Sequence, residues 1–316
     1  MSHGSKFKIK FRGTRGSYPT PKENFLNFGG NTSCVEVLCG KQLIILDAGT
    51  GIIDVGNDVV KNSILNNLNS LNNKDFKNEN IAHQATILLS HIHQDNIQGL
   101  QFYKPLFNPK AKINIFGLVN SGENLKDTLK TILFDKVFPL SLDEIKSNLE
   151  IHNFQGEDVV VISQEGIIKR YTTFDKPKIQ KNDIKITTCK TMAHPKSGSL
   201  SIKIEFNNKT LVYATDKESY IGSDKKFIQF AYGCDCLIHD AQYTYDDYAN
   251  AISPKQGFGH STFEMASETK ELAKAKRLFF FHYDPEYDDN KLKMLEEEFK
   301  KGDEIAFAKE NLEIEL

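Results

Sequence analysis

Residues 90–99 read Ser-His-Ile-His-Gln-Asp-Asn-Ile-Gln-Gly, and this stretch decides how the rest of the chain is interpreted. It places three side chains that can bind a metal, His91, His93 and Asp95, directly after the short apolar run 85–89. Alternate residues of extended backbone point to the same side, so the two histidines can face one point and the carboxylate can join them from the following turn. Imidazole suits Zn, Fe, Co or Mn, and a carboxylate adds a hard ligand and negative charge. Taken alone, however, a His-x-His pair fits a polar surface loop equally well.

The composition is that of an ordinary globular protein. The chain has 316 residues, of which 39% are hydrophobic and 26% charged, so a sizeable core is feasible. A formal net charge of −2 does not support a general attraction to nucleic acid or to an anionic membrane. No apolar stretch is long enough to span a bilayer, and the start of the chain lacks the apolar segment of a signal peptide. Five cysteines, an odd number without a short-domain framework, favour reduced thiols and a cytoplasmic location.

The hydrophobic pattern predicts many short strands with helices between them. The predicted strands are 7–11, 33–38, 42–46, 85–89, 113–116, 159–162, 184–188, 200–206, 210–213, 236–238 and 278–281, and the predicted helices are 54–71, 125–133, 262–276 and 288–300. Strands followed by intermittent helices, twice over, suit an α/β fold in which two sheets pack face to face with helices outside. No internal repeat and no Pro/Gly-rich linker divides the chain, so we expect one domain over residues 1–316. Within it, the stretch 120–180 fits an insertion over the site as well as core structure.

Other segments, before and after residues 91–96, occur in an order that resembles a known family. They are residues 13–17, 29–33, 46–51, 193–195, 213–216, 259–262 and 281–285. The chain resembles the metallo-β-lactamase superfamily, whose signature is His-x-His-x-Asp-His, at every position but the last, where Asn96 stands in place of the final histidine. Within that superfamily, the opening segments and the two late His motifs look closest to the phosphodiesterase and tRNA 3′-processing branch. The resemblance implies an α/β fold, the four-layer αββα metallo-β-lactamase-like sandwich.

The resemblance also implies a metal centre. One or two divalent ions are expected, zinc first, with manganese or iron as alternatives. Such ions lower the pKa of bound water to about 7, so that hydroxide is available to attack phosphorus or a carbonyl carbon. By the resemblance, the first ion sits with His91, His93 and His194, and the second with Asp95, His282 and, as a weak ligand, Asn96, while Asp216 bridges both.

Other residues are expected to support this centre. Asp95 and His260 are the candidate catalytic residues, with His260 either holding the phosphate or giving a proton to the leaving group. Asp47 and Asp240 are expected behind the metal ligands, where they orient the ligands or tie down a turn. The ordinary alternatives are a helix cap for Asp216, a buried hydrogen-bonded side chain for His282, a surface residue for His194 and a helix start for His260.

Asn96 is the one departure from the pattern. An amide oxygen is neutral, harder and weaker toward zinc than an imidazole nitrogen, so the second site should lose affinity. Three outcomes follow: a single-metal enzyme, a two-metal enzyme that favours manganese or iron, or a chain that no longer catalyses. Because the other ligands all remain, we expect metal binding to be retained.

The expected function is that of a metal-dependent hydrolase, specifically a phosphodiesterase acting on a small or cyclic-nucleotide phosphodiester. Small substrates are preferred over RNA because the chain has no strong positive charge and no separate long arm suited to gripping tRNA. The alternatives are a hydrolase of an ester, lactone or thioester, and a non-catalytic metal- or nucleotide-binding protein that arose with Asn96. A homodimer is compatible with the resemblance, and nothing in the sequence demands one.

Overall fold

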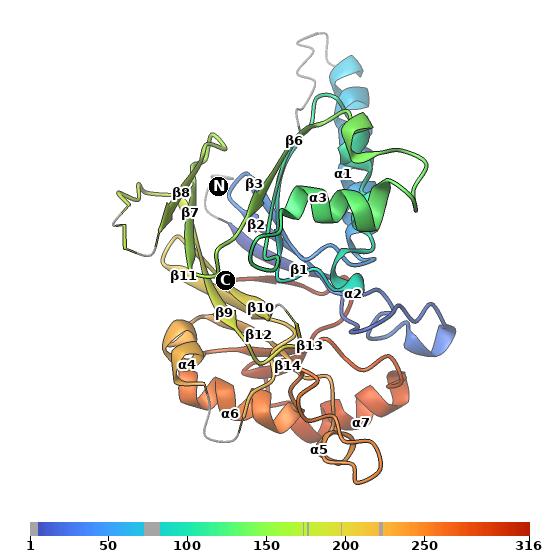
Figure 1. The fold of residues 1–316 in the computed structure, drawn as a ribbon, viewed down its shortest axis with the longest axis vertical. Helices are drawn as coiled ribbons and strands as arrows, with labels where there is room; N and C mark the ends of the chain where they lie inside the picture. The colour runs from blue at the N-terminus through green and yellow to red at the C-terminus, as the bar shows by residue number, and fades with distance from the viewer. Residues whose placement is uncertain (1–5, 73–82, 173, 176, 197, 221–223) are drawn as a thin grey trace.

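The computed structural model stacks two β-sheets face to face and places helices on the outer side of each (Figure 1). It describes residues 6–72, 83–172, 174–175, 177–196, 198–220 and 224–316. Helices α1 (Ile52–Asn72) and α3 (Leu125–Leu129) lie on one side of the sheets, and α4 (Lys225–Ala231), α6 (Phe263–Ala273) and α7 (Asp289–Phe299) lie on the other. This order of layers confirms the four-layer αββα sandwich.

The first sheet has seven strands in the order β15-β1-β2-β3-β4-β5-β6. Strands β15, β1, β2 and β3 pair antiparallel, whereas β3, β4, β5 and β6 run parallel. Parallel strands end at the same edge of a sheet, so the loops that follow β3 and β4 open side by side. The strands are β1 (Phe7–Gly13), β2 (Cys34–Cys39), β3 (Gln42–Leu46), β4 (Gln84–Leu89), β5 (Lys112–Gly117), β6 (Asn148–Asn153) and β15 (Glu313–Glu315).

The second sheet has eight strands in the order β14-β13-β12-β11-β10-β9-β7-β8. Its antiparallel half runs from β8 to β11, and its parallel half from β11 to β14. The loops after β11, β12 and β13 therefore also share one edge. The strands are β7 (Asp158–Ile162), β8 (Ile168–Thr172), β9 (Ile184–Thr191), β10 (Ser199–Phe206), β11 (Lys209–Ala214), β12 (Cys236–Asp240), β13 (Leu278–Phe281) and β14 (Ile305–Phe307).

The main core fills the space between the two sheets. Phe11 of β1 and Phe279 of β13 meet across it, with ring centroids 5.2 Å apart. A second apolar cluster joins α1 and α3 to the outer face of the first sheet, and a third joins α4, α6 and α7 to the second. Strands that are covered on both faces need apolar side chains, which explains the apolar run of β13 and the apolar first three residues of β12.

Short helical segments connect these elements. They are α2 (Gln94–Ile97), α5 (Tyr245–Tyr248), the 3₁₀ turns η1 (Glu23–Phe25), η2 (Leu100–Phe102), η3 (Lys104–Phe107) and η5 (Leu142–Glu144), and the π-helical turn η4 (Lys130–Phe134) that continues α3.

Most predicted elements are present with slightly shifted ends, and the strands 42–46 and 278–281 have the predicted bounds. The pattern did not indicate β6, β8, β14 and β15, which are short or partly exposed strands with weak apolar alternation. The stretch 120–180 contributes β6 to the first sheet and β7 and β8 to the second.

All five cysteines lie in the described part of the chain, where they are buried and form no disulfide. Among the described helices, none has both the length and the apolar character needed to cross a membrane.

Candidate metal centre

The first half of the site is the loop between β4 and α2. His91 is fully buried, and its Nδ1 lies 3.1 Å from the hydroxyl of Ser90, which leaves Nε2 for another partner. His93 follows in extended backbone at the start of α2. Asp95 lies in the first turn of α2, and its Oδ2 accepts a hydrogen bond from the backbone N–H of Ser17 at 2.8 Å. This short loop thus presents two imidazoles and a carboxylate to one place.

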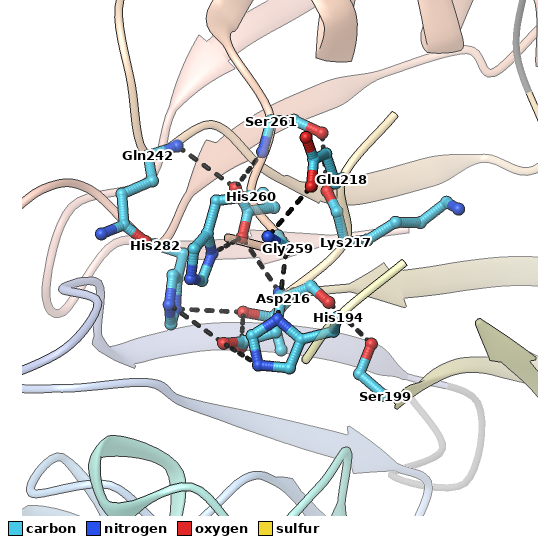
Figure 2. Close-up of polar contacts among 12 residues, drawn as sticks. His194, Ser199, Asp216, Lys217, Glu218, Gln242, Gly259, His260, Ser261 and His282 are labelled. Atoms are coloured by element: carbon cyan, nitrogen blue, oxygen red, sulfur yellow. Dashed lines mark hydrogen bonds and ion pairs between the residues drawn. The ribbon is translucent and has the colours of Figure 1, made fainter. Parts of the chain in front are cut away.

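The second half of the site comes from three separate loops of the second sheet. His194 follows β9, Asp216 follows β11 and His282 follows β13. Asp216 and His282 have positive φ values of 50° and 66°, a conformation that side chains other than glycine adopt at a cost of about 1–3 kcal/mol. In Figure 2, His194, Asp216 and His282 point toward one another from these loops. Strained backbone at two strand ends therefore turns donor groups inward.

The two halves meet at the carboxylate of Asp216. Its Oδ1 lies 3.6 Å from Nε2 of His91, 3.7 Å from Nε2 of His194 and 3.3 Å from Nε2 of His282. The rings of His91, His93 and His194 have centroids 4.4 to 4.7 Å apart. One ligand atom from each of these three histidines and from Asp216 falls within 4.8 Å of the others. Such a group of donors has the composition and spacing of a metal site.

The polar atoms of this cluster are poorly satisfied by the protein itself. Nε2 of His91 and Nε2 of His282 are buried, and neither has a hydrogen-bond partner among the described residues. Nε2 of His194 faces Nδ1 of His93 at 2.9 Å, so two ring nitrogens share at most one proton between them. Buried polar atoms without partners are costly, and a divalent cation would satisfy these nitrogens together. The residues present fit a metal ion.

Charge at the cluster also favours a cation. Burial lowers the pKa of His91 and of His194, so both rings are held neutral, as metal ligands must be. Burial opposes a charge on His282 too, but the Asp216 carboxylate outweighs it and raises the pKa of His282 to about 10. In turn, the positive charge of His282 and its contact with the carboxylate outweigh the effect of burial and hold the pKa of Asp216 well below its usual value. The carboxylates therefore draw positive charge to this point.

Asp47 lies under the first loop. Its Oδ1 accepts the backbone N–H of Ser90 at 2.7 Å, and its Oδ2 accepts the hydroxyls of Ser90 at 2.9 Å and Tyr213 at 2.8 Å. Burial raises the pKa of Asp47 to about 8. Because Ser90 in turn contacts Nδ1 of His91, Asp47 fixes the orientation of that ring without reaching the cluster.

Asp240 holds the second half together. Its Oδ2 lies 2.8 Å from Nδ1 of His260 and accepts the backbone N–H of Asp216 at 3.0 Å. Its Oδ1 accepts the backbone N–H groups of Gln242 at 3.2 Å and Ser261 at 2.9 Å. Burial disfavours a charged His260, but the Asp240 carboxylate outweighs it and raises the pKa of His260. Asp240 thus positions both a cluster carboxylate and the neighbouring histidine.

The comparison with known families agrees with this geometry. The model of the β-lactamase superfamily domain matches residues 43–283, which is more than half of the chain. The chain belongs to the β-lactamase superfamily. It is therefore a metal-dependent hydrolase by family, and the metallo-β-lactamase resemblance that the sequence indicated is confirmed.

Curated relatives within the superfamily are similar over most of their length. Ribonuclease Z of Picrophilus torridus is 28% identical over 309 residues, which cover 90% of this chain and 88% of that protein. Ribonuclease Z of Pyrococcus furiosus is 22% identical over 311 residues, 89% of this chain and 87% of that protein. Their name, ribonuclease Z, indicates that these relatives act on RNA. This argues against the small-molecule substrate that was preferred because of the weak charge of the sequence.

Solved structures support the superfamily fold. The metallo-β-lactamase fold protein YhfI of Bacillus subtilis superposes with a TM-score of 0.59 at 20% identity, covering 99% of this chain and 100% of that one. The short form of human tRNase Z superposes with a TM-score of 0.55 at 18% identity, covering 97% and 98%. At such identities these similarities concern the fold.

Several residues that shape this superfamily site escaped the sequence analysis. Glu218, which is 1% exposed, accepts the backbone N–H groups of Gly257 and Gly259 and the hydroxyl of Tyr248, and so holds the loop before His260 (Figure 2). The carbonyl of Gly259 lies 3.2 Å from Nδ1 of His194. A buried glutamate two residues after Asp216 has no local signal in the sequence, because its partners lie about 40 residues away.

Two small residues let the loops approach the cluster. A Cβ on Gly16 would lie 2.6 Å from the ring of His282, and one on Gly259, whose φ is +91°, would lie 2.1 Å from Nδ1 of His194. Glycine is therefore required at both positions for the histidines to sit where they do.

Proposed function

We propose that this chain hydrolyses phosphodiester bonds in RNA. The observation that carries the proposal is the convergence of buried donors from both sheets on one point, beside a histidine held by Asp240. The curated ribonuclease Z of Picrophilus torridus, which matches 90% of the chain, supports an RNA substrate. The proposed metal ligands are His91, His93, Asp95, His194, Asp216 and His282, with Asn96 beside them.

Divalent ions at this cluster would neutralise phosphate charge and make hydroxide available at neutral pH. The chain's own residues hold and orient the ligands. Ser90 and Asp47 fix the ring of His91, the carbonyl of Gly259 fixes His194, and the hydroxyl of Ser33 lies 2.8 Å from Nδ1 of His282. Each ring is thereby left with its other nitrogen directed into the cluster.

His260 is the proposed proton donor to the leaving oxygen. Its Nδ1 is held by Asp240, so Nε2 is the atom left to reach a substrate. The raised pKa favours the protonated ring, which can donate a proton or hold a negatively charged phosphate oxygen. Its ring stacks on that of His282 with centroids 5.1 Å apart, which places it at the edge of the metal cluster.

A groove of about 540 Å³ begins beside the cluster and can take a nucleoside. Ser17, which donates its N–H to Asp95, lines the groove next to Gln242, whose Nε2 donates to the hydroxyl of Ser17 at 3.2 Å. Aromatic faces can stack on a base of any sequence. Tyr18, which is 51% exposed, offers such a face, whereas Tyr243 and Tyr287 are buried in the wall of the groove. Lys255 and the acidic side chains of Asp247, Asp284 and Glu286 also line it.

The acidic groups of this groove favour a single nucleoside over a run of phosphates. Three carboxylates against one lysine make a poor path for a polyanionic backbone. This balance, with the net charge of −2, keeps a small or cyclic phosphodiester as the second candidate.

A substrate comparison tests the proposal. Protein loaded with Zn or Mn would be assayed on 3′-extended tRNA transcripts, unstructured RNA, cyclic nucleotides and bis(p-nitrophenyl) phosphate. We expect endonucleolytic RNA cleavage with a kcat/KM above that for the small diesters. Cleavage of cyclic nucleotides alone would favour the second candidate, and no turnover with any metal would indicate a binding protein.

We also propose that residues 1–316 form one domain. Strand β15, near the end of the chain, pairs with β1 near its start, and the stretch 120–180 extends both sheets. The homodimer and the cytoplasmic location stay predictions.

A further inference from the structure

The two ends of the metal cluster offer different chemistry. One end presents three imidazoles, from His91, His93 and His194, together with Asp216. At the other end, His282 is the imidazole, and its Nε2 lies 3.3 Å from Oδ1 of Asp216 and 3.5 Å from Oδ2 of Asp95. Imidazole suits zinc, whereas carboxylate and carbonyl oxygens suit harder ions such as Mn²⁺ and Mg²⁺. The donor sets therefore differ in hardness.

Asn96 strengthens this difference. The residue is fully buried, and its backbone is fixed because its N–H donates to the carbonyl of His93 at 3.1 Å and its carbonyl accepts the N–H of Ala48 at 2.7 Å. Its Nδ2 donates to Oδ2 of Asp216 at 3.4 Å, but its Oδ1 is buried without a hydrogen-bond donor among the described residues. An unsatisfied buried oxygen costs about 1–3 kcal/mol. A cation at this end would satisfy it.

His260 is the other nearby donor, and its geometry argues against a place in the ligand set. One ligand atom from each of Asp216, His260 and His282 falls within 4.8 Å of the others. However, the rings of His260 and His282 are stacked at an interplanar angle of 16°. The lone pair of an imidazole nitrogen lies in the ring plane, so two stacked rings direct their lone pairs side by side and not to one ion. Nδ1 of His260 is also held by Asp240.

We propose that this chain is a mixed-metal enzyme, with zinc at the His91, His93 and His194 end and a harder divalent ion at the end formed by Asp95, Asn96 and His282. Asp216 is shared by the two positions. The inference rests on the metal cluster of the proposed function and adds that the two positions select different ions. Asn96 sets the selectivity, because it places an oxygen where an imidazole would favour zinc.

Metal counting tests the proposal without any substrate. Metal-free protein would be incubated with excess ZnCl₂, with excess MnCl₂, or with both, passed through a desalting column and analysed for metal by mass spectrometry. With both ions present, we expect one zinc and one manganese per chain, and the manganese should give an electron paramagnetic resonance signal of bound Mn²⁺. Two equally retained zinc ions would overturn the proposal, and so would a chain that takes no second ion of either kind.

Three variants assign the effect to residue 96. Asn96→His should bind two zinc ions and lose manganese, whereas Asn96→Asp, which keeps an oxygen of similar size, should still bind one of each. His260→Gln is the matched control, and both metal counts should stay unchanged. An Asn96→His protein that folds but keeps one zinc and one manganese would contradict the role of Asn96. If Asn96→His does not fold, Asn96→Asp decides, since loss of its manganese would contradict an oxygen-selective position.

These results are independent of the substrate. Mixed occupancy without RNA cleavage would leave the metal inference standing and remove the proposed function. RNA cleavage by a protein with two zinc ions would support the proposed function and overturn the metal inference.

Discussion

The two halves of the site reach the same point by different routes. The first half is one loop after β4, in which His91, His93 and Asp95 follow each other at alternate positions. The second half collects His194, Asp216 and His282 from three loops of the other sheet, and two of these residues have positive φ. In the first half, extended backbone aligns the two histidines, and the first turn of α2 adds Asp95 from the next residues. In the second half, the fold must align them.

Each half rests on an aspartate at the end of a parallel strand. Asp47 follows β3, and among the described residues its carboxylate accepts hydrogen bonds from Ser90 and Tyr213, so it acts on the cluster through Ser90. Asp240 ends β12 and contacts both the backbone of Asp216 and the ring of His260. In the second half, therefore, the supporting aspartate also contacts the proposed proton donor, His260.

The largest effect should come from removing a metal ligand from either half. Both His93→Ala and His194→Ala should lose the zinc ion and reduce the rate by about 10³-fold or more, because metal ions contribute several kcal/mol to the stabilisation of the transition state. Metal analysis and turnover of bis(p-nitrophenyl) phosphate measure both effects. If only one of the two variants loses metal, the halves do not share an ion.

His260→Gln should separate catalysis from metal binding. We expect a rate lower by about 10²- to 10⁴-fold, the usual contribution of a general acid, with an unchanged metal content. A substrate with a better leaving group, which needs less protonation, should lose less rate. An equal loss for all leaving groups would indicate that His260 binds phosphate and does not donate a proton.

Asp240→Asn should change the pH dependence. The Asp240 carboxylate raises the pKa of His260, and a protonated acid works below its pKa, so activity is expected to fall as the pH rises through that value. Removing the carboxylate should lower the pKa of His260 and move this alkaline limb to lower pH. The rate at neutral pH should fall by about 100-fold. An unshifted profile would remove Asp240 from the proton-transfer account.

Asp47→Asn should have the smallest effect on the rate, about tenfold, with metal retained. Asparagine tolerates the φ of 58° at this position, but its single acceptor oxygen cannot satisfy the donors from Ser90 and Tyr213. We expect a loss of about 1–3 kcal/mol in the free energy of unfolding, measured by urea denaturation. A larger rate loss than in Asp240→Asn would reverse the comparison between the two halves.

The same contrast explains what the sequence could predict. His91, His93 and Asp95 are close in the chain, so their spacing alone made a shared ligand site as good an interpretation as a polar surface loop, and the resemblance decided between the two. His194 and His282 could be placed only by resemblance, because single histidines at loop ends carry no local signal. The hold of Glu218 on the loop before His260 was not foreseeable, since it depends on contacts between distant loops.

In the fold, too, the features with a local sequence signal could be predicted, and those set by distant contacts could not. Buried strands such as β3 and β13 are continuous apolar runs and were predicted with their observed bounds. Strands β8 and β15 lie at sheet edges, where exposed side chains remove the apolar signal, and their pairing is set by tertiary contacts.

X-ray absorption at the zinc edge tests the shared cluster most directly. For protein carrying one zinc ion, we predict three imidazole ligands at about 2.0–2.1 Å with further oxygen ligands, and one imidazole fewer at any residual zinc in His194→Ala. A spectrum with sulfur or with oxygen ligands alone, or one that His194→Ala leaves unchanged, would contradict the meeting of the two sheets on one metal.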